Sequence, residues 1–333
     1  MAATIKDIAK ETGLGLATIS SYLNGGNVRE QNRVKIEQAI KELHYEVNEV
    51  ARGLKTNRTK LIGILIPELN NIFCTEIITE IEDLLRGHGY ATMVCDCRTD
   101  EKREKEAVEF LKKRRVDGII AMPSGKSGKH FSKLQKSGIP VVLLDRKLDD
   151  ADCDYVLVDN REGAKEAVAR LIEAGHRKIG VITGPEHIFT AKERLLGYYE
   201  ALNEAGVCEN EQLVSYNDYT IQGGIKGLRK LVEANPDMTA VFATNYELTM
   251  GVVIEANDLN MRIPEELSVI GFDNVEFARA CVPKLSIVSQ PTKEIACQVA
   301  QLMLQRLEEE SFEDSVEVRL QTSFIEGKSV KGK

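Results

Sequence analysis

The sequence has no run of apolar residues that approaches the roughly 18–20 needed to cross a membrane as a helix. Its first residues are polar and charged and contain no apolar segment typical of a signal peptide, so we expect a cytoplasmic protein with no membrane partner. Proline is scarce, at 8 of 333 residues, while 43% of residues are hydrophobic. This composition is typical of a globular chain with a large core, and the length suggests two or three domains.

Signatures of catalysis are also missing. There is no GxxxxGK(S/T) phosphate loop, no HExxH zinc motif and no GxSxG nucleophile elbow. Gly223, Gly224 and Gly227 lie in a stretch with helical periodicity and not directly after a strand, so they do not form a dinucleotide-binding fingerprint. We therefore expect no enzyme activity, no catalytic residues and no cofactor.

The seven cysteines are scattered and odd in number. The closest pair, Cys95 and Cys97, would share one face of a strand, but a metal site would need a second pair or neighbouring histidines. The five histidines show no metal-ligand spacing. We therefore expect reduced, buried thiols and no metal site.

Acidic residues outnumber basic ones, and the net charge of −8 argues against a simple nucleic-acid binder. The charge is unevenly distributed, however. Residues 1–60 hold ten Lys and Arg against seven Asp and Glu, a net charge of +3, which leaves −11 for the rest of the chain. A mildly basic head on an acidic body indicates a DNA-binding module joined to another domain, and so small a charge would require two heads acting together.

The N-terminal segment shows the pattern of two short helices. Ile5, Ile8 and Ala9 mark the apolar face of the first, and Gly13 is expected to end it because glycine readily adopts the left-handed conformation of a tight turn. The second is predicted over residues 16–23. Its inner face carries Ile19 and Leu23, and its outer face carries Leu16, Ala17, Thr18 and Ser21. This pattern is typical of a helix-turn-helix, whose second helix enters the DNA major groove, although a hairpin used only for packing has the same pattern.

A third amphipathic helix is predicted over residues 29–43, and it completes a three-helix head over residues 1–46. Its apolar residues are Val34, Ile36, Ala39, Ile40 and Leu43. The segment 47–60 that follows is short and carries a single large apolar side chain, Leu54, near its end, so it would be unstable as a free helix. It is either a flexible linker or a hinge that folds when it meets DNA.

From residue 61 onward, short apolar runs alternate with amphipathic helices. The predicted strands are 61–66, 91–95, 118–122, 141–144, 154–158, 178–183, 213–215, 240–243, 268–272 and 286–289. The predicted helices are 75–88, 101–115, 128–137, 161–174, 191–205, 221–234, 246–260 and 292–309. This alternation predicts two α/β units with parallel sheets covered on both faces. We expect a bilobed core over residues 61–333, with lobe 1 at about 61–160 plus 292–322 and lobe 2 at about 161–291 plus the C-terminus.

Polar or aromatic residues stand where several of these strands end. They are Asn71-Ile72-Phe73, Asp96, Asp145-Arg146, Asn245, Asp273-Asn274 and Gln290, with Arg194 on a following helix. Asp and Asn can hold vicinal hydroxyls, Arg can hold a carboxylate, and Phe can lie against an apolar sugar face. The set favours a small-molecule site between the lobes, although a strand-end Asp often only caps the next helix.

Motifs along essentially the whole chain resemble the LacI/GalR family of bacterial transcription regulators. They are Thr4-Ile-Lys-Asp-Ile-Ala, Ala17-Thr-Ile-Ser, Leu23-Asn-Gly, Tyr45-x-x-Asn-x-x-Ala-Arg-x-Leu, Val116-Asp-Gly-Ile-Ile, Gly138-Ile-Pro-Val-Val, Gly175-His-Arg-Lys-Ile, Arg194-Leu-x-Gly-Tyr and Val269-Ile-Gly-Phe-Asp. The resemblance implies a homodimeric repressor of a pseudo-palindromic double-stranded DNA operator. It also implies a hinge helix and a periplasmic-binding-protein-like core that takes a small effector, usually a sugar or nucleoside.

The resemblance assigns roles to individual residues. Base contacts fall to Leu16, Ala17 and Ser21, and other DNA contacts to Thr4, Lys6, Thr18, Asn24, Tyr45 and Asn48. Leu54 becomes a wedge in the minor groove, with Lys55 beside it. The effector-binding positions are Phe73, Asp145, Arg194, Tyr219, Asn245, Asp273 and Gln290.

The chain departs from the family pattern at several positions. Ser21 stands where Arg or His is common, Ile72 replaces the frequent proline, and Tyr246 replaces Asp. We expect no tetramer, because the sequence ends without a leucine-heptad tail. Two alternatives remain open: a global regulator controlled by a protein partner, with a vestigial cleft, and a solute-binding protein, which the DNA-binding motif disfavours. Whether an effector weakens or strengthens DNA binding does not follow from the sequence.

Overall fold

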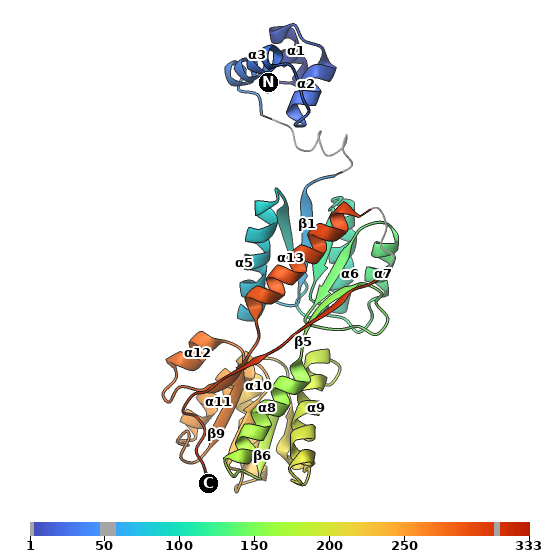
Figure 1. Ribbon diagram of the computed structural model, residues 1–333. Helices are drawn as coiled ribbons and strands as arrows, with labels where there is room; N and C mark the ends of the chain where they lie inside the picture. The colour runs from blue at the N-terminus through green and yellow to red at the C-terminus, as the bar shows by residue number, and fades with distance from the viewer. Residues whose placement is uncertain (1–2, 47–57, 310–313) are drawn as a thin grey trace. The chain divides into compact units, whose positions relative to one another are not determined.

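The structure is a computed structural model that describes residues 3–46, 58–309 and 314–333 (Figure 1). The chain divides into two compact units, Met1–Thr59 and Lys60–Lys333. The expected DNA-contacting residues Asn48, Leu54 and Lys55 lie outside the described residues.

The first unit is the predicted three-helix head. Its helices are α1 (Ile5–Thr12), α2 (Leu16–Leu23) and α3 (Glu30–Glu42). The Thr4 N–H and hydroxyl both donate to the Asp7 carboxylate, at 2.8 and 2.7 Å, which fixes the start of α1. Gly13 ends α1 with a φ of +67°, as predicted. The core comprises Ile8, Ile19, Ile36 and Ala39. The prediction for Val34 was wrong, because this side chain is 53% exposed on the outer face of α3.

The second unit contains two sheets of six strands each. Lobe 1 holds β1 (Leu61–Ile66), β2 (Ala91–Asp96), β3 (Gly118–Ala121), β4 (Val141–Leu144), β5 (Asp154–Val158) and β11 (Glu317–Leu320). Lobe 2 holds β6 (Ile179–Thr183), β7 (Val214–Tyr216), β8 (Ala240–Ala243), β9 (Ser268–Phe272), β10 (Ser286–Ser289) and β12 (Ser323–Ile325). The strand orders, β11-β5-β4-β3-β1-β2 and β12-β10-β9-β8-β6-β7, are equivalent. All described pairs are parallel except β10–β12.

Helices cover both faces of each sheet (Figure 1). Those of lobe 1 are α5 (Ile72–Gly87) and α13 (Thr292–Glu308) on one face and α6 (Glu101–Lys113) and α7 (Lys129–Lys136) on the other. Those of lobe 2 are α8 (Asn160–Glu173) and α9 (Phe189–Glu204) on one face and α10 (Ile221–Ala234) and α11 (Tyr246–Asp258) on the other. The predicted fold class, an all-α head and a bilobed α/β core, is therefore confirmed.

The chain passes between the lobes three times, after β5, after β10 and after β11. Helix α8, which follows β5 of lobe 1, therefore packs on lobe 2, and α13, which follows β10 of lobe 2, packs on lobe 1. Equivalent residues of the two lobes consequently meet at the edge where the strands end. The Asp145 N–H donates to the Val156 carbonyl in lobe 1, at 3.1 Å, and the Asp273 N–H donates to the Val288 carbonyl in lobe 2, at 2.8 Å.

Several short elements were not predicted from the sequence. They are β11, β12, the 3-10 helix η1 (Glu211–Leu213) and helix α12 (Val275–Ala280). Strand β2 is an edge strand with partly exposed residues, not a buried one. Within the described ranges, no helix is long and apolar enough to cross a membrane.

Candidate functional site

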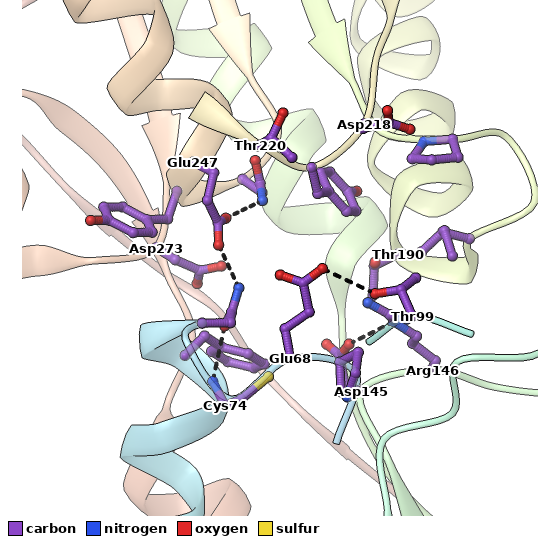
Figure 2. A pocket seen from close by; sticks show the side chains of 18 of the residues that line it. Glu68, Cys74, Thr99, Asp145, Arg146, Thr190, Asp218, Thr220, Glu247 and Asp273 are labelled. Carbon is purple, nitrogen blue, oxygen red and sulfur yellow. Dashed lines mark hydrogen bonds and ion pairs between the residues drawn. The ribbon is translucent and has the colours of Figure 1, made fainter. Parts of the chain in front are cut away.

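A cavity of about 480 Å³ lies between the two lobes (Figure 2). Its walls include all seven residues expected to bind an effector: Phe73, Asp145, Arg194, Tyr219, Asn245, Asp273 and Gln290. They come from the segments that follow several strands, from the first turn of α5 and from α9, because the parallel strands of a lobe end at one edge of its sheet and the two edges face each other. The structure thus brings the set together, and its role stays a prediction.

Arg194 is the most firmly held side chain of the cavity. It is only 3% exposed, and its Nε donates to Asn160 Oδ1 at 2.8 Å while its Nη1 donates to the Thr244 carbonyl at 2.6 Å. The guanidinium carbon lies 3.7 Å from the centroid of the Phe272 ring, close enough for a cation–π interaction. These contacts fix the orientation of the guanidinium before any ligand enters.

Two aspartates occupy equivalent positions after β4 and β9, and both have a left-handed backbone, with φ of +66° at Asp145 and +63° at Asp273. Gln290 Nε2 donates to both carboxylate oxygens of Asp273, at 2.9 and 3.0 Å. Burial raises the pKa of Asp273 to about 6, and burial also raises the pKa of Asp145. The Arg146 Nε lies 3.4 Å from Asp145 Oδ2 and opposes that shift.

Glu247 links the two lobes and was missed in the sequence. Its carboxylate accepts one hydrogen bond from Asn71 of lobe 1, at 2.6 Å, and another from Asn245 of lobe 2, at 2.5 Å. Asn71 and Asn245 also cap α5 and α11 by accepting from the backbone N–H of Cys74 and Leu248. Burial raises the pKa of Glu247 to about 7. The sequence signal was its position in the first turn after a strand-end asparagine.

Other strand-end residues behave differently. The prediction that Asp96 lines the cavity was wrong, because its carboxylate instead accepts from the Arg98 N–H at 2.9 Å. Asn274 caps α12 by accepting from the Phe277 N–H, and it lines a smaller neighbouring cavity of about 160 Å³. Further wall residues that the sequence did not single out include Glu68, His187, Asp218 and Thr220.

The expected DNA-contacting residues of the head are only partly exposed. Leu16 and Ala17 are exposed on α2, whereas Thr18 and Ser21, which were expected on the outer face, are half-buried. Ser21 is covered because the turn after α2 folds back over it, where the Gly26 N–H donates to its carbonyl at 2.8 Å. The remaining head positions are exposed at Thr4, Lys6 and Asn24 and half-buried at Tyr45.

The cysteines are free thiols, but not all are buried as expected. Cys208 is exposed, and three others are only partly buried. Burial raises the pKa of Cys97 and Cys153 to about 12, so these two are unreactive as thiolates. No group of three or more His, Cys, Asp or Glu in the described part of the chain could hold a metal ion.

Both units match known sequence families. Residues 4–48 match bacterial regulatory proteins of the lacI family, and residues 59–327 match the periplasmic binding proteins and sugar binding domain of the LacI family. Catabolite control protein A of Priestia megaterium is 32% identical over 318 residues, which cover 95% of this chain and 96% of that protein. The transcriptional repressor PurR of Edwardsiella ictaluri (strain 93-146) is 33% identical over 331 residues, which cover 98% and 97%.

A solved structure is similar over the whole length as well. The complex of the transcriptional regulator CelR with cellobiose superposes with a TM-score of 0.75 at 30% identity, covering 98% of this chain and 99% of that chain. The similarity therefore extends over the head and both lobes.

Proposed function

The chain belongs to the lacI family of bacterial regulatory proteins, and we propose that it is a repressor whose affinity for its operator depends on a small effector in the cleft. The observation that carries this proposal is that one chain combines a helix-turn-helix head with a polar cavity of about 480 Å³. Family members are transcriptional regulators, so the proposal involves no enzymatic step and no cofactor.

The head is proposed to read DNA with few strong base contacts. Leu16, Ala17 and Ser21 would meet base edges, and none of them offers the bidentate donors of arginine. The backbone and other DNA contacts would come from Thr4, Lys6, Thr18, Asn24, Tyr45 and Asn48, with Leu54 and Lys55 at the minor groove. Much of the selectivity would then come from the Leu54 wedge and from the deformability of the operator.

The cleft is proposed to bind a sugar or a nucleoside. Asp145, Asp273 and Asn245 can accept or donate hydrogen bonds to hydroxyl groups, and Arg194 is already oriented by the protein. Phe73, Tyr219 and Gln290 complete the proposed contacts, the two rings lying against the apolar face of the ligand.

The proposed domains are the head at 1–46, the hinge at 47–60 and the core at 61–333. The protein would act as a homodimer, because a head with a net charge of +3 in residues 1–60 gains affinity from a second, linked head. A cytoplasmic location follows from the proposed DNA operator. The effector acts only through its difference in affinity for the two arrangements of the core.

The test begins with an operator selected from random duplexes by the full-length protein. Operator affinity is then measured at fixed salt by fluorescence anisotropy, with and without a panel of sugars and nucleosides. We expect at least one compound to change the operator affinity. We expect Arg194→Ala, assayed at a temperature at which circular dichroism shows it folded, to bind the operator normally and to lose that response. Absence of a selectable operator contradicts the repressor, whereas an operator that no compound affects favours control by a protein partner.

Leu54→Ala tests the wedge separately. Operator affinity should fall while affinity for random DNA stays unchanged, because the wedge contributes mainly to the specific, bent complex. An equal loss on both duplexes, or no loss on either, contradicts the wedge.

A further inference from the structure

Carboxylates outnumber cations on the cavity wall among the described residues. The acidic side chains that line it are Glu68, Asp145, Asp218, Glu247 and Asp273. The basic ones are Arg146 and Arg194, and the imidazole of His187 also lines the cavity. The cavity is therefore net negative in a unit that already carries most of the acidic excess of the chain. A phosphate or carboxylate on a ligand would be repelled there.

Both guanidinium groups are already engaged by the protein. Arg146 lies beside the Asp145 carboxylate and donates from Nη1 to the Pro123 carbonyl at 3.0 Å. Arg194 makes two hydrogen bonds within lobe 2 and lowers the pKa of Asp273 against the effect of burial. The wall thus sets two guanidinium groups against five carboxylates, and this balance of charge disfavours an anionic ligand.

Among the half-buried carboxylates of the cavity wall, Glu68 is the one that the protein holds least. Its hydrogen bond with Thr99 Oγ1 is long, at 3.4 Å, and no cation lies within ion-pair distance of it in the described part of the chain. Figure 2 shows its side chain extending into the cavity between Asp145 and Glu247. A half-buried carboxylate in this position favours a ligand that brings a positive charge or strong donors.

A second observation also points to a donor-rich ligand. Gln290 is only 6% exposed and lines the cavity, and its Nε2 is used by Asp273. Its Oε1 is buried without a hydrogen-bond partner among the described residues. A buried acceptor without a donor is costly, so a ligand whose entry turns this amide toward the cavity and supplies it with an N–H or O–H gains affinity.

We propose that the effector is a polyol that carries a protonated amine, such as an amino sugar, and that Glu68 binds the amine. This inference rests on the proposed function, because it names the ligand class of the same cleft. The carboxylate and ammonium form a charge-assisted hydrogen bond that a hydroxyl at the same position cannot match.

The experiment compares matched pairs by calorimetry at pH 7 with the full-length protein: glucosamine with glucose, galactosamine with galactose, and mannosamine with mannose. We expect at least one amino sugar to bind about tenfold more tightly than the neutral sugar of its pair, and we expect glucose 6-phosphate not to bind. The preference should shrink in high salt, because salt screens a partly exposed ion pair.

Glu68→Gln should abolish the preference for the amino sugar, while the neutral sugar of the pair keeps its affinity. The matched control is Glu265→Gln, the same chemical change at an exposed position outside the cavity, which should keep the preference. A neutral sugar that binds as tightly as its amine in every pair overturns the inference. So does a preference that survives Glu68→Gln, or a failure of every amino sugar to bind. Operator binding is measured in parallel, so a protein that binds DNA and responds to neutral sugars retains the proposed function and loses only this inference.

Discussion

Lobe 1 and lobe 2 have equivalent strand orders, but their helices pack differently. In lobe 2, α10 and α11 approach so closely that a Cβ on Gly224 would lie 2.3 Å from the Leu248 carbonyl oxygen, and one on Gly251 would lie 2.2 Å from that of Ile221. In lobe 1, a Cβ on Gly118, the glycine at the start of β3, would meet the flexible side chain of Met303 first, with the Pro140 ring 3.4 Å away. Backbone therefore meets backbone between α10 and α11, whereas at Gly118 the nearest neighbour is an adaptable side chain.

The cleft residues follow the same division. Arg194, Asn245 and Gln290 of lobe 2 are buried, whereas Phe73 and Asp145 of lobe 1, like Tyr219 and Asp273 of lobe 2, are partly exposed. The buried, preformed residues of the site therefore all come from lobe 2. Rigid support of the residues that orient a ligand lowers the entropy cost of binding it.

The largest effect is expected from removing the buried guanidinium of lobe 2. Arg194→Ala leaves Asn160 Oδ1 and the Thr244 carbonyl without their donor and should lower the free energy of unfolding by about 4 kcal/mol. Arg146→Ala, the equivalent truncation in lobe 1, should cost only about 1.5 kcal/mol, because it makes one hydrogen bond to the protein backbone. Urea denaturation measures both. Equal losses in the free energy of unfolding would show that the two lobes hold their cleft residues equally firmly.

A methyl group between the helices tests the packing difference. Gly224→Ala should cost about 3 kcal/mol, since the new Cβ meets backbone that cannot move without separating α10 from α11. Gly118→Ala should cost about 1 kcal/mol, because the sulfur of Met303 can rotate away. If urea denaturation shows Gly118→Ala to be less stable than Gly224→Ala, the proposed difference in packing between the lobes is contradicted.

Glu247 should give lobe 2 a distinctive pH dependence. Its folded pKa of about 7 lies above the ordinary value of 4.5, so the folded state holds the proton more tightly than the unfolded chain. Its contribution to stability is fully present below pH 4.5 and is lost as the pH rises through 7. The stability of Glu247→Gln relative to the parent should therefore increase by about 3 kcal/mol between pH 4 and pH 8.

The control for that titration is Glu266→Gln. The Arg262 N–H lowers the pKa of Glu266, so its contribution is present above the ordinary pKa and lost in acid. The relative stability of this variant should change in the opposite direction as the pH rises. The measurement is the urea midpoint of each variant and of the parent across the pH range. If the relative stability of both variants changes with pH in the same direction, the raised pKa of Glu247 is contradicted.

The smallest effect concerns the two capping asparagines. Asn71→Ala and Asn245→Ala each remove a helix N-cap and should each cost about 1 kcal/mol. Each variant also loses a hydrogen bond to Glu247, but only the bond from Asn71 joins the two lobes, so Asn71→Ala should be the less stable of the two by about 0.5 kcal/mol. Thermal unfolding resolves the ranking, and the reverse order would argue against a bond between the lobes in solution.

Much of this molecule was predictable because its signals are local. Periodicity predicted the three head helices and nearly all of the long strands and helices, and Gly13 ends α1 as expected. The cavity brings together the seven residues that the family resemblance assigned to effector binding, and Asp145, Asn245, Asp273 and Gln290 among them lie where parallel strands end at one edge of a sheet. Asp96 shows the limit of that rule, because β2 lies at the edge of its sheet and ends away from the cavity.

By itself, the sequence determined which segments form most of the helices and strands, and it placed the two aspartates at strand ends and Arg194 on a following helix. Only the tertiary structure decided that β11 and β12 are strands, because their short, partly polar runs are extended by pairing with distant residues. It alone decided that Glu247 joins Asn71 to Asn245 and that Glu68 faces the cavity with little support. Helix and strand periodicity depends on residues that are close in the sequence. Burial, hydrogen-bond partners and the balance of charge in a cavity arise only when distant segments meet.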